Sequence, residues 1–258
     1  MSHPLKVCSF NLRVAAQVDG INYFPNRLNR IVSLIREEKP DLLGMQELRD
    51  SMKEALRDAL PEYIMLGCGR TSNYRGESPV LAFRRDTIEL VRLETYWHSD
   101  TPSVPASTFG GDQSSCPRNF HAALLKHKDF DQLFWFINTH FDHQGAQARY
   151  LSAIQIRQFI DEKNEPFVLT GDLNASPESP ELLRLIAPTR RPICHASQGV
   201  GGTFHAFGQI PKENMVQIDY VITDMACDPT LSYAVQDEPI DGVYASDHFP
   251  VFAFVTPQ

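Results

Sequence analysis

The chain has few cysteines, and they form no motif. Its five cysteines stand far apart among the 258 residues, and no CxxC pair occurs. They are Cys8, Cys68, Cys116, Cys194 and Cys227. An odd number of scattered cysteines indicates neither a disulfide framework nor a zinc site built from thiolates. We therefore expect buried, reduced thiols.

Long apolar segments are also missing. Nowhere does an uninterrupted apolar run reach the length that spans a membrane. The N-terminal stretch MSHPLKVCSFNLRV has only a short apolar part and lacks the long hydrophobic region of a signal peptide. We expect a soluble, cytoplasmic protein without a membrane partner, and we infer no obligate protein partner.

Positive charge is scarce. The sequence has 24 Lys and Arg against 32 Asp and Glu, which gives a formal net charge of -8. The pI calculated from the sequence is about 5.6. Proteins whose affinity depends on many phosphate contacts carry a basic surface instead. Extended duplex nucleic acid is therefore a poor candidate partner, although a local basic pocket for a shorter nucleic acid is compatible with these numbers.

No low-complexity segment, run of like charges or linker interrupts the chain. With 42% hydrophobic residues, a chain of this length can bury a substantial core. We expect a single domain over residues 1–258.

Apolar strands and amphipathic helices alternate in the first part of the chain. The runs LKVCSFNL and DLLGMQE are apolar on both faces, which predicts buried strands. Helical spacing of apolar residues predicts helices over 26–39 and 50–60, and a proline follows each of them. Ser51 is the expected cap of the second helix.

From residue 63 onward the pattern is mostly β, with one long helix predicted over 144–163. The predicted strands are YIMLGC, PVLAFRR, TIELVRLETYW, FHAALLKH, LFWFINTH, PFVLTGDLN, QIDYVIT, DPTLSYAVQ and FPVFAFV. Two of them predict a hairpin around 128–131, and the stretch 99–117, rich in Ser, Thr, Pro and Gly, predicts a loop. This mixture predicts an α/β fold with two packed sheets and helices outside.

Polar or ionisable residues stand at or near the ends of six apolar strands. They are Asn11, Glu47, His140, Asp172 with Asn174, Asp219, and Asp247 with His248. If those ends converge, ionised carboxylates come close together, and they repel one another unless a cation lies between them. Oxygen ligands without thiolates select a hard ion such as Mg²⁺ or Mn²⁺. The set therefore points to metal-assisted chemistry on phosphate esters.

The strand ends also carry a family resemblance. In order, the strings FN, QE, NTH, GDLN, IDY and SDH resemble the endonuclease/exonuclease/phosphatase superfamily, which includes DNase I-like nucleases, abasic-site endonucleases, deadenylases and inositol phosphatases. The resemblance covers residues 11–255. Stretches such as THFDHQGAQAR, GDLNASPESPE and TFHAFG are most similar to the compact bacterial members, described only as family hydrolases. The resemblance implies a DNase I-like four-layer α/β sandwich, in which two face-to-face mixed β-sheets are flanked by helices.

The resemblance also implies a metal site for Mg²⁺ or Mn²⁺. Glu47 would be the principal ligand, and Asn11 and Asp247 would complete the site directly or through water. Some nuclease members carry a carboxylate two residues after the first Asn, where this chain has Arg13. This departure argues against close similarity to the abasic-site endonucleases and against a second metal on that side.

The resemblance implies catalytic roles for the remaining strand ends. Asp172 would orient and deprotonate the attacking water, with help from Asn174. His248, paired with Asp219, would stabilise charge on the scissile phosphate. His140 would bind a phosphate oxygen or assist the leaving group.

Further residues are candidates for binding substrate. Arg118 and Arg149 could aim guanidinium groups at phosphate, and surface ion pairs are the alternative. His143 and His205 could line the substrate pocket, and structural roles in loops or in the core are the alternative.

The expected function is that of a Mg²⁺- or Mn²⁺-dependent phosphoesterase that hydrolyses a phosphodiester or phosphomonoester, with a small ester or short oligonucleotide favoured. The alternatives within the enzyme class are a nuclease on longer DNA or RNA and a phosphatase of lipid or sugar phosphates. A non-catalytic binding module on the same fold would usually have lost one or more of the polar strand ends, and none is lost here. The substrate itself depends on the loops 69–78, 99–117 and 197–208, whose conformations the sequence does not give.

Overall fold

The computed structural model describes residues 4–129, 132–188 and 191–257. One sheet consists of β1 (Leu5–Asn11), β2 (Leu42–Leu48), β3 (Tyr63–Leu66), β4 (Ser78–Arg84), β11 (Ala226–Cys227), β12 (Tyr233–Ala234) and β13 (Val251–Thr256). The other consists of β5 (Ile88–Trp97), β6 (Asn119–His127), β7 (Leu133–His140), β8 (Phe167–Asp172), β9 (Cys194–His195) and β10 (Asp219–Thr223). The strand orders are β11-β13-β1-β2-β4-β3, with β12 also on β13, and β5-β6-β7-β8-β10-β9.

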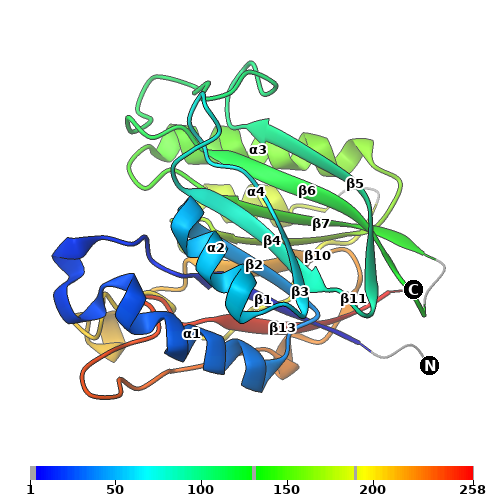
Figure 1. Cartoon of the computed structure of the whole chain (residues 1–258). Helices are drawn as coiled ribbons and strands as arrows, with labels where there is room; N and C mark the ends of the chain where they lie inside the picture. Colours follow the sequence, from blue (N-terminus) through cyan, green and yellow to red (C-terminus); the bar gives the residue numbers. More distant parts are fainter. Residues whose placement is uncertain (1–3, 130–131, 189–190, 258) are drawn as a thin grey trace.

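Helices cover the outer faces of the two sheets. The helices are α1 (Phe24–Glu38), α2 (Asp50–Ala59), α3 (Ala146–Glu162) and α4 (Pro180–Ile186), with short 3-10 turns η1 (Gln17–Asn22), η2 (Lys212–Asn214) and η3 (Pro229–Leu231). Figure 1 shows α1 and α2 on one side of the stacked sheets and α3 and α4 on the other. This arrangement confirms the predicted four-layer sandwich. None of the helices in the described ranges is long and apolar enough to cross a membrane.

Three apolar clusters hold the four layers together. The middle cluster lies between the sheets and contains Val7 of β1 and Phe136 of β7. A second cluster joins the first sheet to α1 and α2 and contains Phe10 and Ile31. A third joins the second sheet to α3 and α4 and contains Phe159. Because successive residues of β1 alternate between two clusters, that strand is buried on both faces, as predicted.

Strand direction brings the polar strand ends to one edge of the sandwich. β1 runs parallel to β2, and β7 runs parallel to β8, so each pair ends at the same edge of its sheet. β13 is antiparallel to β1 and β10 is antiparallel to β8, so these two strands begin at that edge. In this register Asp172 stands opposite His140 on one side and Asp219 on the other. β1 begins and β13 ends at the far edge (Figure 1).

Most predicted elements are present, with differences that have local causes. α2 begins after Arg49 without a side-chain cap, so the assignment of Ser51 as the cap is wrong. The predicted strand over 228–236 is mostly wrong, because the side chain of Asp228 caps the η3 turn and leaves only β12 to pair. α4 was not predicted, since its seven residues are too short for a clear period. The predicted hairpin is confirmed by β6 and β7, although residues 130–131 lie outside the described part.

The prediction of reduced thiols is wrong for two cysteines. Cys194 of β9 and Cys227 of β11 form a disulfide that links the second sheet to the first. Cys8, Cys68 and Cys116 are free, and the first of them is buried. Because disulfides persist mainly in oxidising compartments, the cytoplasmic expectation loses the support that reduced thiols throughout would have given it.

Candidate active site

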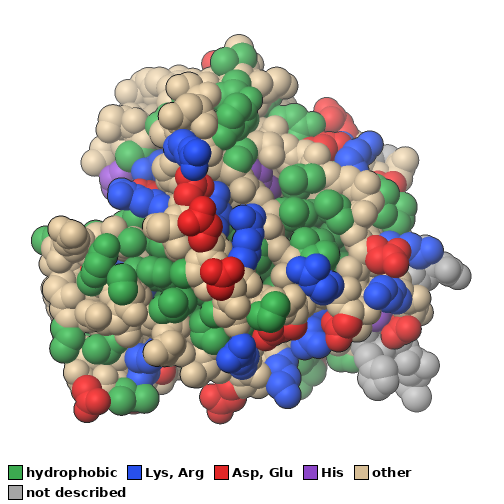
Figure 2. All heavy atoms as spheres, viewed as in Figure 1, with side chains coloured by type: hydrophobic (Ala, Val, Ile, Leu, Met, Phe, Trp, Pro, Cys, Tyr) green, Lys and Arg blue, Asp and Glu red, His purple; other side chains and the backbone are tan. Residues whose placement is uncertain are grey.

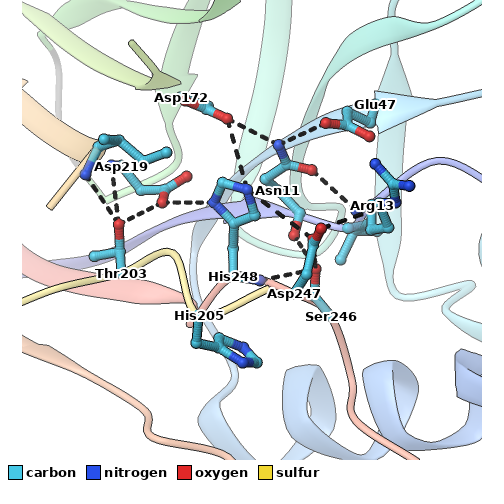
Figure 3. Close-up of polar contacts among 12 residues, drawn as sticks. Asn11, Arg13, Glu47, Asp172, Thr203, His205, Asp219, Ser246, Asp247 and His248 are labelled. Carbon is cyan, nitrogen blue, oxygen red and sulfur yellow. Dashed lines mark hydrogen bonds and ion pairs between the residues drawn. The ribbon is translucent and has the colours of Figure 1, made fainter. Parts of the chain in front are cut away.

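Figure 3 labels the strand-end residues that meet at one edge of the two sheets, namely Asn11, Glu47, Asp172, Asp219, Asp247 and His248. Asn11 and Glu47 come from β1 and β2 of one sheet, and Asp172 and Asp219 come from β8 and β10 of the other. His248 precedes β13 and lies between the two groups in the close-up. The site is therefore built across the gap between the sheets.

Asn11 joins the two sheets at the centre of the site. Its side chain is fully buried, and its Nδ2 donates to Oε1 of Glu47 at 3.0 Å and to Oδ2 of Asp172 at 2.9 Å. Its Oδ1 accepts from the backbone N–H of Arg13 at 2.9 Å. One amide therefore fixes the position of a carboxylate from each sheet.

Glu47 occupies a bulge at the end of β2. The pairing register with β4 shifts between Met45 and Leu48, and Glu47 has a φ of 67°. A bulge of this kind turns a side chain away from the normal alternation of the strand. Oε2 of Glu47 accepts from the backbone N–H of Val14 at 2.8 Å. Burial would raise the pKa of Glu47, but the hydrogen bonds from Val14 and Asn11 lower it, so the carboxylate is ionised at neutral pH.

Positive φ angles recur at this edge of the sandwich. Arg13 and Asn174 have φ angles of 53° and 48°, in the same left-handed region as Glu47. This conformation is costly for residues other than glycine, and it clusters at functional sites where the surrounding structure holds it in place. The positive φ angles therefore agree with a functional edge.

His248 and Asp219 form a buried pair. Nδ1 of His248 lies 2.8 Å from Oδ2 of Asp219, and the hydroxyl of Thr203 donates to the same oxygen at 2.6 Å. Burial would lower the pKa of His248, but the charge of Asp219 and its hydrogen bond outweigh burial and raise it. An imidazolium held in this way can donate from Nε2 to an anionic ligand.

Asp172 is buried between two imidazoles. Its Oδ2 lies 3.5 Å from Nε2 of His140 and 3.9 Å from Nε2 of His248. Its Oδ1 accepts from the backbone N–H of Asn174 at 2.9 Å, and Nδ2 of Asn174 lies 3.0 Å from Nε2 of His140. The pKa of Asp172 is raised, mainly by burial and secondly by the nearby charge of Asp219. A carboxylate with a raised pKa is a better proton acceptor for water near neutral pH.

The oxygen donors at this edge fit a hard divalent cation. Glu47, Asp247 and Asn11 offer two carboxylates and an amide oxygen, which is the ligand chemistry of Mg²⁺ and Mn²⁺. Burial raises the pKa of Asp247, and the nearby charge of Glu47 acts in the same direction. Such repulsion between carboxylates is what a bound cation relieves.

A second acidic grouping lies beside the first. Among the residues that the structure describes, Asp172, Asp219 and His248 each place a ligand atom within 4.8 Å of the other two. Oδ1 of Asp219 is buried and has no hydrogen-bond partner in those ranges. The predicted ligands Glu47 and Asp247 are not part of this group, so the division between metal ligands and catalytic residues stays a prediction.

Of the predicted substrate-binding residues, Arg118 lies at the site. It lines a small pocket together with Glu47 and His140. His143 is exposed and does not line that pocket, but its Nδ1 accepts from Nη2 of Arg118 at 3.0 Å. His143 therefore positions the arginine.

The other two substrate-binding candidates have structural partners. Nε of Arg149 donates to Oε1 of Glu181 at 3.0 Å, which ties α3 to α4. His205 is buried, stacks on Phe249 with ring centroids 4.2 Å apart, and accepts from the backbone N–H of Gly208 at 3.1 Å. Burial lowers the pKa of His205 to about 4, so it is neutral at pH 7.

Sequence reasoning missed several residues that support the site. Thr203 holds Asp219, and the hydroxyl of Ser246 donates to the backbone oxygen of Asn11 at 2.6 Å. Nε of Arg13 lies 3.8 Å from Oδ2 of Asp247, whereas the sequence singled out this arginine only as a departure from the family pattern. Ser246 belongs to the string SDH, and that position next to Asp247 was the available signal.

Comparisons with known proteins agree with this geometry. The sequence model of the endonuclease/exonuclease/phosphatase family matches residues 8–251. A solved endonuclease/exonuclease/phosphatase from Bacteroides vulgatus is 30% identical, with a TM-score of 0.91 and 99% of both chains covered. The mannosyl-6-phosphatase of Bacteroides thetaiotaomicron is 26% identical, with a TM-score of 0.82 over 98% of this chain and 100% of that one. An uncharacterized protein of Acanthamoeba polyphaga mimivirus is 26% identical over 167 residues, which span 61% of this chain and 62% of that relative.

Proposed function

Because the chain belongs to the endonuclease/exonuclease/phosphatase family, a family of phosphoester hydrolases, we propose that it is a Mg²⁺- or Mn²⁺-dependent phosphoesterase. Its substrate is a small phosphate ester or the end of a short oligonucleotide, hydrolysed by in-line attack of water. The observation that carries this proposal is the position of Asp172. Its Oδ2 accepts from Nδ2 of Asn11 at 2.9 Å and lies 3.9 Å from Nε2 of His248, which supports a role for Asp172 as a base between the proposed cation site and the proposed phosphate-binding imidazole.

Glu47, Asn11 and Asp247 would hold the cation. When bound, the cation would polarise a phosphate oxygen and neutralise charge that develops in the transition state. The hydrogen bonds of Asn11 and Val14 keep Glu47 ionised and oriented for this role.

Asp172 would take the proton of the attacking water. Its two oxygens are held by Asn11 and by the backbone N–H of Asn174, so the carboxylate cannot rotate away from the water. Its raised pKa makes it a stronger base than an exposed aspartate, which is the condition for general-base catalysis near neutral pH.

The two imidazoles would act on the phosphate group. Asp219 keeps His248 cationic, so its Nε2–H can donate to a phosphate oxygen on which charge develops. Burial lowers the pKa of His140 well below its ordinary value, so this ring is neutral. We assign it to binding a phosphate oxygen or assisting the leaving group.

The charge distribution supports a small substrate over extended nucleic acid. On the face seen in Figure 2, Lys and Arg side chains are interspersed with Asp and Glu and form no continuous basic band. A nuclease acting on long DNA or RNA would need such a band to hold many phosphates. Lipid phosphates are less favoured as well, since the sequence shows no apolar insertion.

A sugar phosphate is the second candidate substrate. The mannosyl-6-phosphatase of Bacteroides thetaiotaomicron shares the fold over nearly the whole chain at 26% identity. We keep this alternative because that neighbour hydrolyses a small phosphate ester on the same scaffold. A non-catalytic binding module is the least favoured alternative, because the catalytic strand ends are present.

The proposal is tested on the purified chain alone, since we propose a single domain without an obligate partner. Phosphomonoesters, phosphodiesters and single-stranded DNA and RNA are incubated with Mg²⁺ or Mn²⁺, with Glu47→Ala in parallel. We expect metal-dependent hydrolysis of at least one small ester by the wild-type protein and none by the variant. Equal, metal-independent rates for both proteins would reject the proposal.

A further inference from the structure

A small pocket adjoins the catalytic residues on the side of β4 and β6. Glu47 and His140 form one part of its lining, and Arg70, Glu77 and Arg118 form another. The volume of the pocket is about 10 Å³. Space of this size holds roughly one water molecule, so it can take a single oxygen atom.

Arg118 brings a buried positive charge to this pocket. Only 5% of the residue is exposed, and its Nε has no hydrogen-bond partner within the described ranges. The carboxylate of Asp142 is 3.8 Å from Nε, too far for a hydrogen bond, and it already accepts from the hydroxyl of Ser114 and the backbone N–H of Gly145. A buried guanidinium with an unmet donor is unfavourable, and an anionic oxygen in the pocket would satisfy it.

Arg70 supplies a second guanidinium whose position is fixed. Its Nη2 donates to Oε1 of Glu77 at 3.0 Å and to Sγ of Cys116 at 3.4 Å. Glu77 forms an ion pair with Arg70, and its charge, like that of Asp142, also favours the charged form of Arg118. The pocket therefore offers an anionic oxygen the unmet Nε–H donor of Arg118.

We propose that the site selects phosphomonoesters, whose phosphate enters with a terminal oxygen in the pocket beside Arg118 and Arg70. This inference rests on the proposed function and narrows its substrate class. A monoester has three terminal oxygens and close to two negative charges, whereas a diester has two terminal oxygens and one charge. The additional terminal oxygen and the additional charge of a monoester match the additional guanidinium.

The reaction that follows is a complete hydrolysis. The water oxygen bonds to phosphorus as the phosphorus–oxygen bond to the alcohol breaks, and the water proton goes to Asp172. The alcohol leaves with a proton from solvent, so the products are the alcohol and inorganic phosphate.

The test compares p-nitrophenyl phosphate with methyl p-nitrophenyl phosphate, which share a leaving group and differ by one methyl group on the phosphate. With Mg²⁺ present, we expect the wild-type protein to favour the monoester in kcat/KM. Arg118→Gln should lower the ratio of monoester to diester kcat/KM by about 10- to 100-fold, because it removes a charge-assisted hydrogen bond. Arg92→Gln is the matched control, since Arg92 is an exposed arginine in the middle of β5 and should leave the ratio unchanged.

The outcomes separate this inference from the proposed function. A wild-type protein that hydrolyses the diester as well as the monoester, with Glu47→Ala inactive on both, would overturn the monoester inference alone. Absence of metal-dependent hydrolysis of either ester would overturn both. If circular dichroism shows that Arg118→Gln is unfolded, the test uses Arg70→Gln instead and measures inhibition by inorganic phosphate. Weaker inhibition of Arg70→Gln than of the wild type supports the inference, and equal inhibition rejects it.

Discussion

The space between the two sheets has two ends that the same strands build in different ways. Read from the far edge toward the site, the inward-facing residues are Leu5, Val7, Ser9 and Asn11 on β1, Phe134, Phe136, Asn138 and His140 on β7, and Val168, Thr170 and Asp172 on β8. Each strand thus begins apolar, passes through an uncharged polar residue and ends at the site, with an amide on β1 and an ionisable group on β7 and on β8. Stability and chemistry are separated along the length of the same strands.

The polar middle layer connects the two ends. Nδ2 of Asn138 donates to the backbone oxygens of Met45 and Val80 at 2.8 and 2.9 Å, and Nε2 of Gln46 donates to Oδ1 of Asn138 at 2.7 Å. Here the sheets approach so closely that a Cβ on Gly44 would lie 1.9 Å from Oγ1 of Thr170. These bonds between sheets fix the spacing that the site requires.

Removing the carboxylate charge at the site end should give the largest effect. We expect Asp172→Asn to lower kcat by about 10²- to 10⁴-fold, because the proton acceptor is lost while shape is kept. The melting temperature should stay the same or rise, since a buried charge near Asp219 is removed. Asp86→Asn, at an exposed aspartate, is the control for both measurements. A kcat within threefold of wild type would show that Asp172 is not the base.

Truncating a side chain at the apolar end should have the opposite effect, a loss of stability with kcat unchanged. Phe136→Ala removes a fully buried ring from the middle cluster and should lower the free energy of unfolding by about 3–5 kcal/mol. The kcat of the folded fraction should be unchanged, because this side chain lies two positions before Asn138 and four before His140. Urea unfolding and kcat per folded molecule measure the two quantities. A loss of kcat without a loss of stability would contradict the separation of stability and chemistry along the strands.

A substitution in the middle layer should affect both properties. Asn138→Ala leaves the backbone oxygens of Met45 and Val80 and the amide of Gln46 without their partner. We expect a loss of about 1–3 kcal/mol in the free energy of unfolding. The kcat should fall as well, by about tenfold, because small displacements of catalytic groups are costly. Loss of stability with full activity would mean that the layer does not position the site.

Acid should weaken the fold gradually, through buried neutral histidines. Burial lowers the pKa of His98 to about 4, from an ordinary value of 6.5. Between these two values the unfolded chain binds more protons than the folded protein, so the free energy of unfolding falls as the pH falls through this window. We expect His98→Gln to make that dependence shallower by up to about 1.4 kcal/mol per pH unit. The free energy of unfolding is measured by urea titration at several pH values between 4 and 6.5. If it depends on pH equally in both proteins, the lowered pKa of His98 is contradicted.

The sequence predicted the strands and the polar residues at their ends because both are local signals. A run such as LFWFINTH shows the apolar strand and its terminal His140 in the same few letters. No local pattern encodes the contact between Thr203 and Asp219 or the pairing of Cys194 with Cys227. Both depend on how segments far apart in the sequence pack together. The bulge at Glu47 is of the same kind, since it exists only in relation to the neighbouring strand.

The left-handed backbone of Glu47 has a consequence for engineering. Glycine or asparagine fits a φ of 67° better than glutamate does, by about 1 kcal/mol for glycine, and neither offers a carboxylate. Either replacement also removes the carboxylate that accepts from the backbone N–H of Val14, and an unpaired buried donor costs about 1–3 kcal/mol. A library selected only for heat tolerance should therefore keep Glu47 for stability alone, so directed evolution would have to score turnover separately to test the proposed role of this carboxylate in hydrolysis.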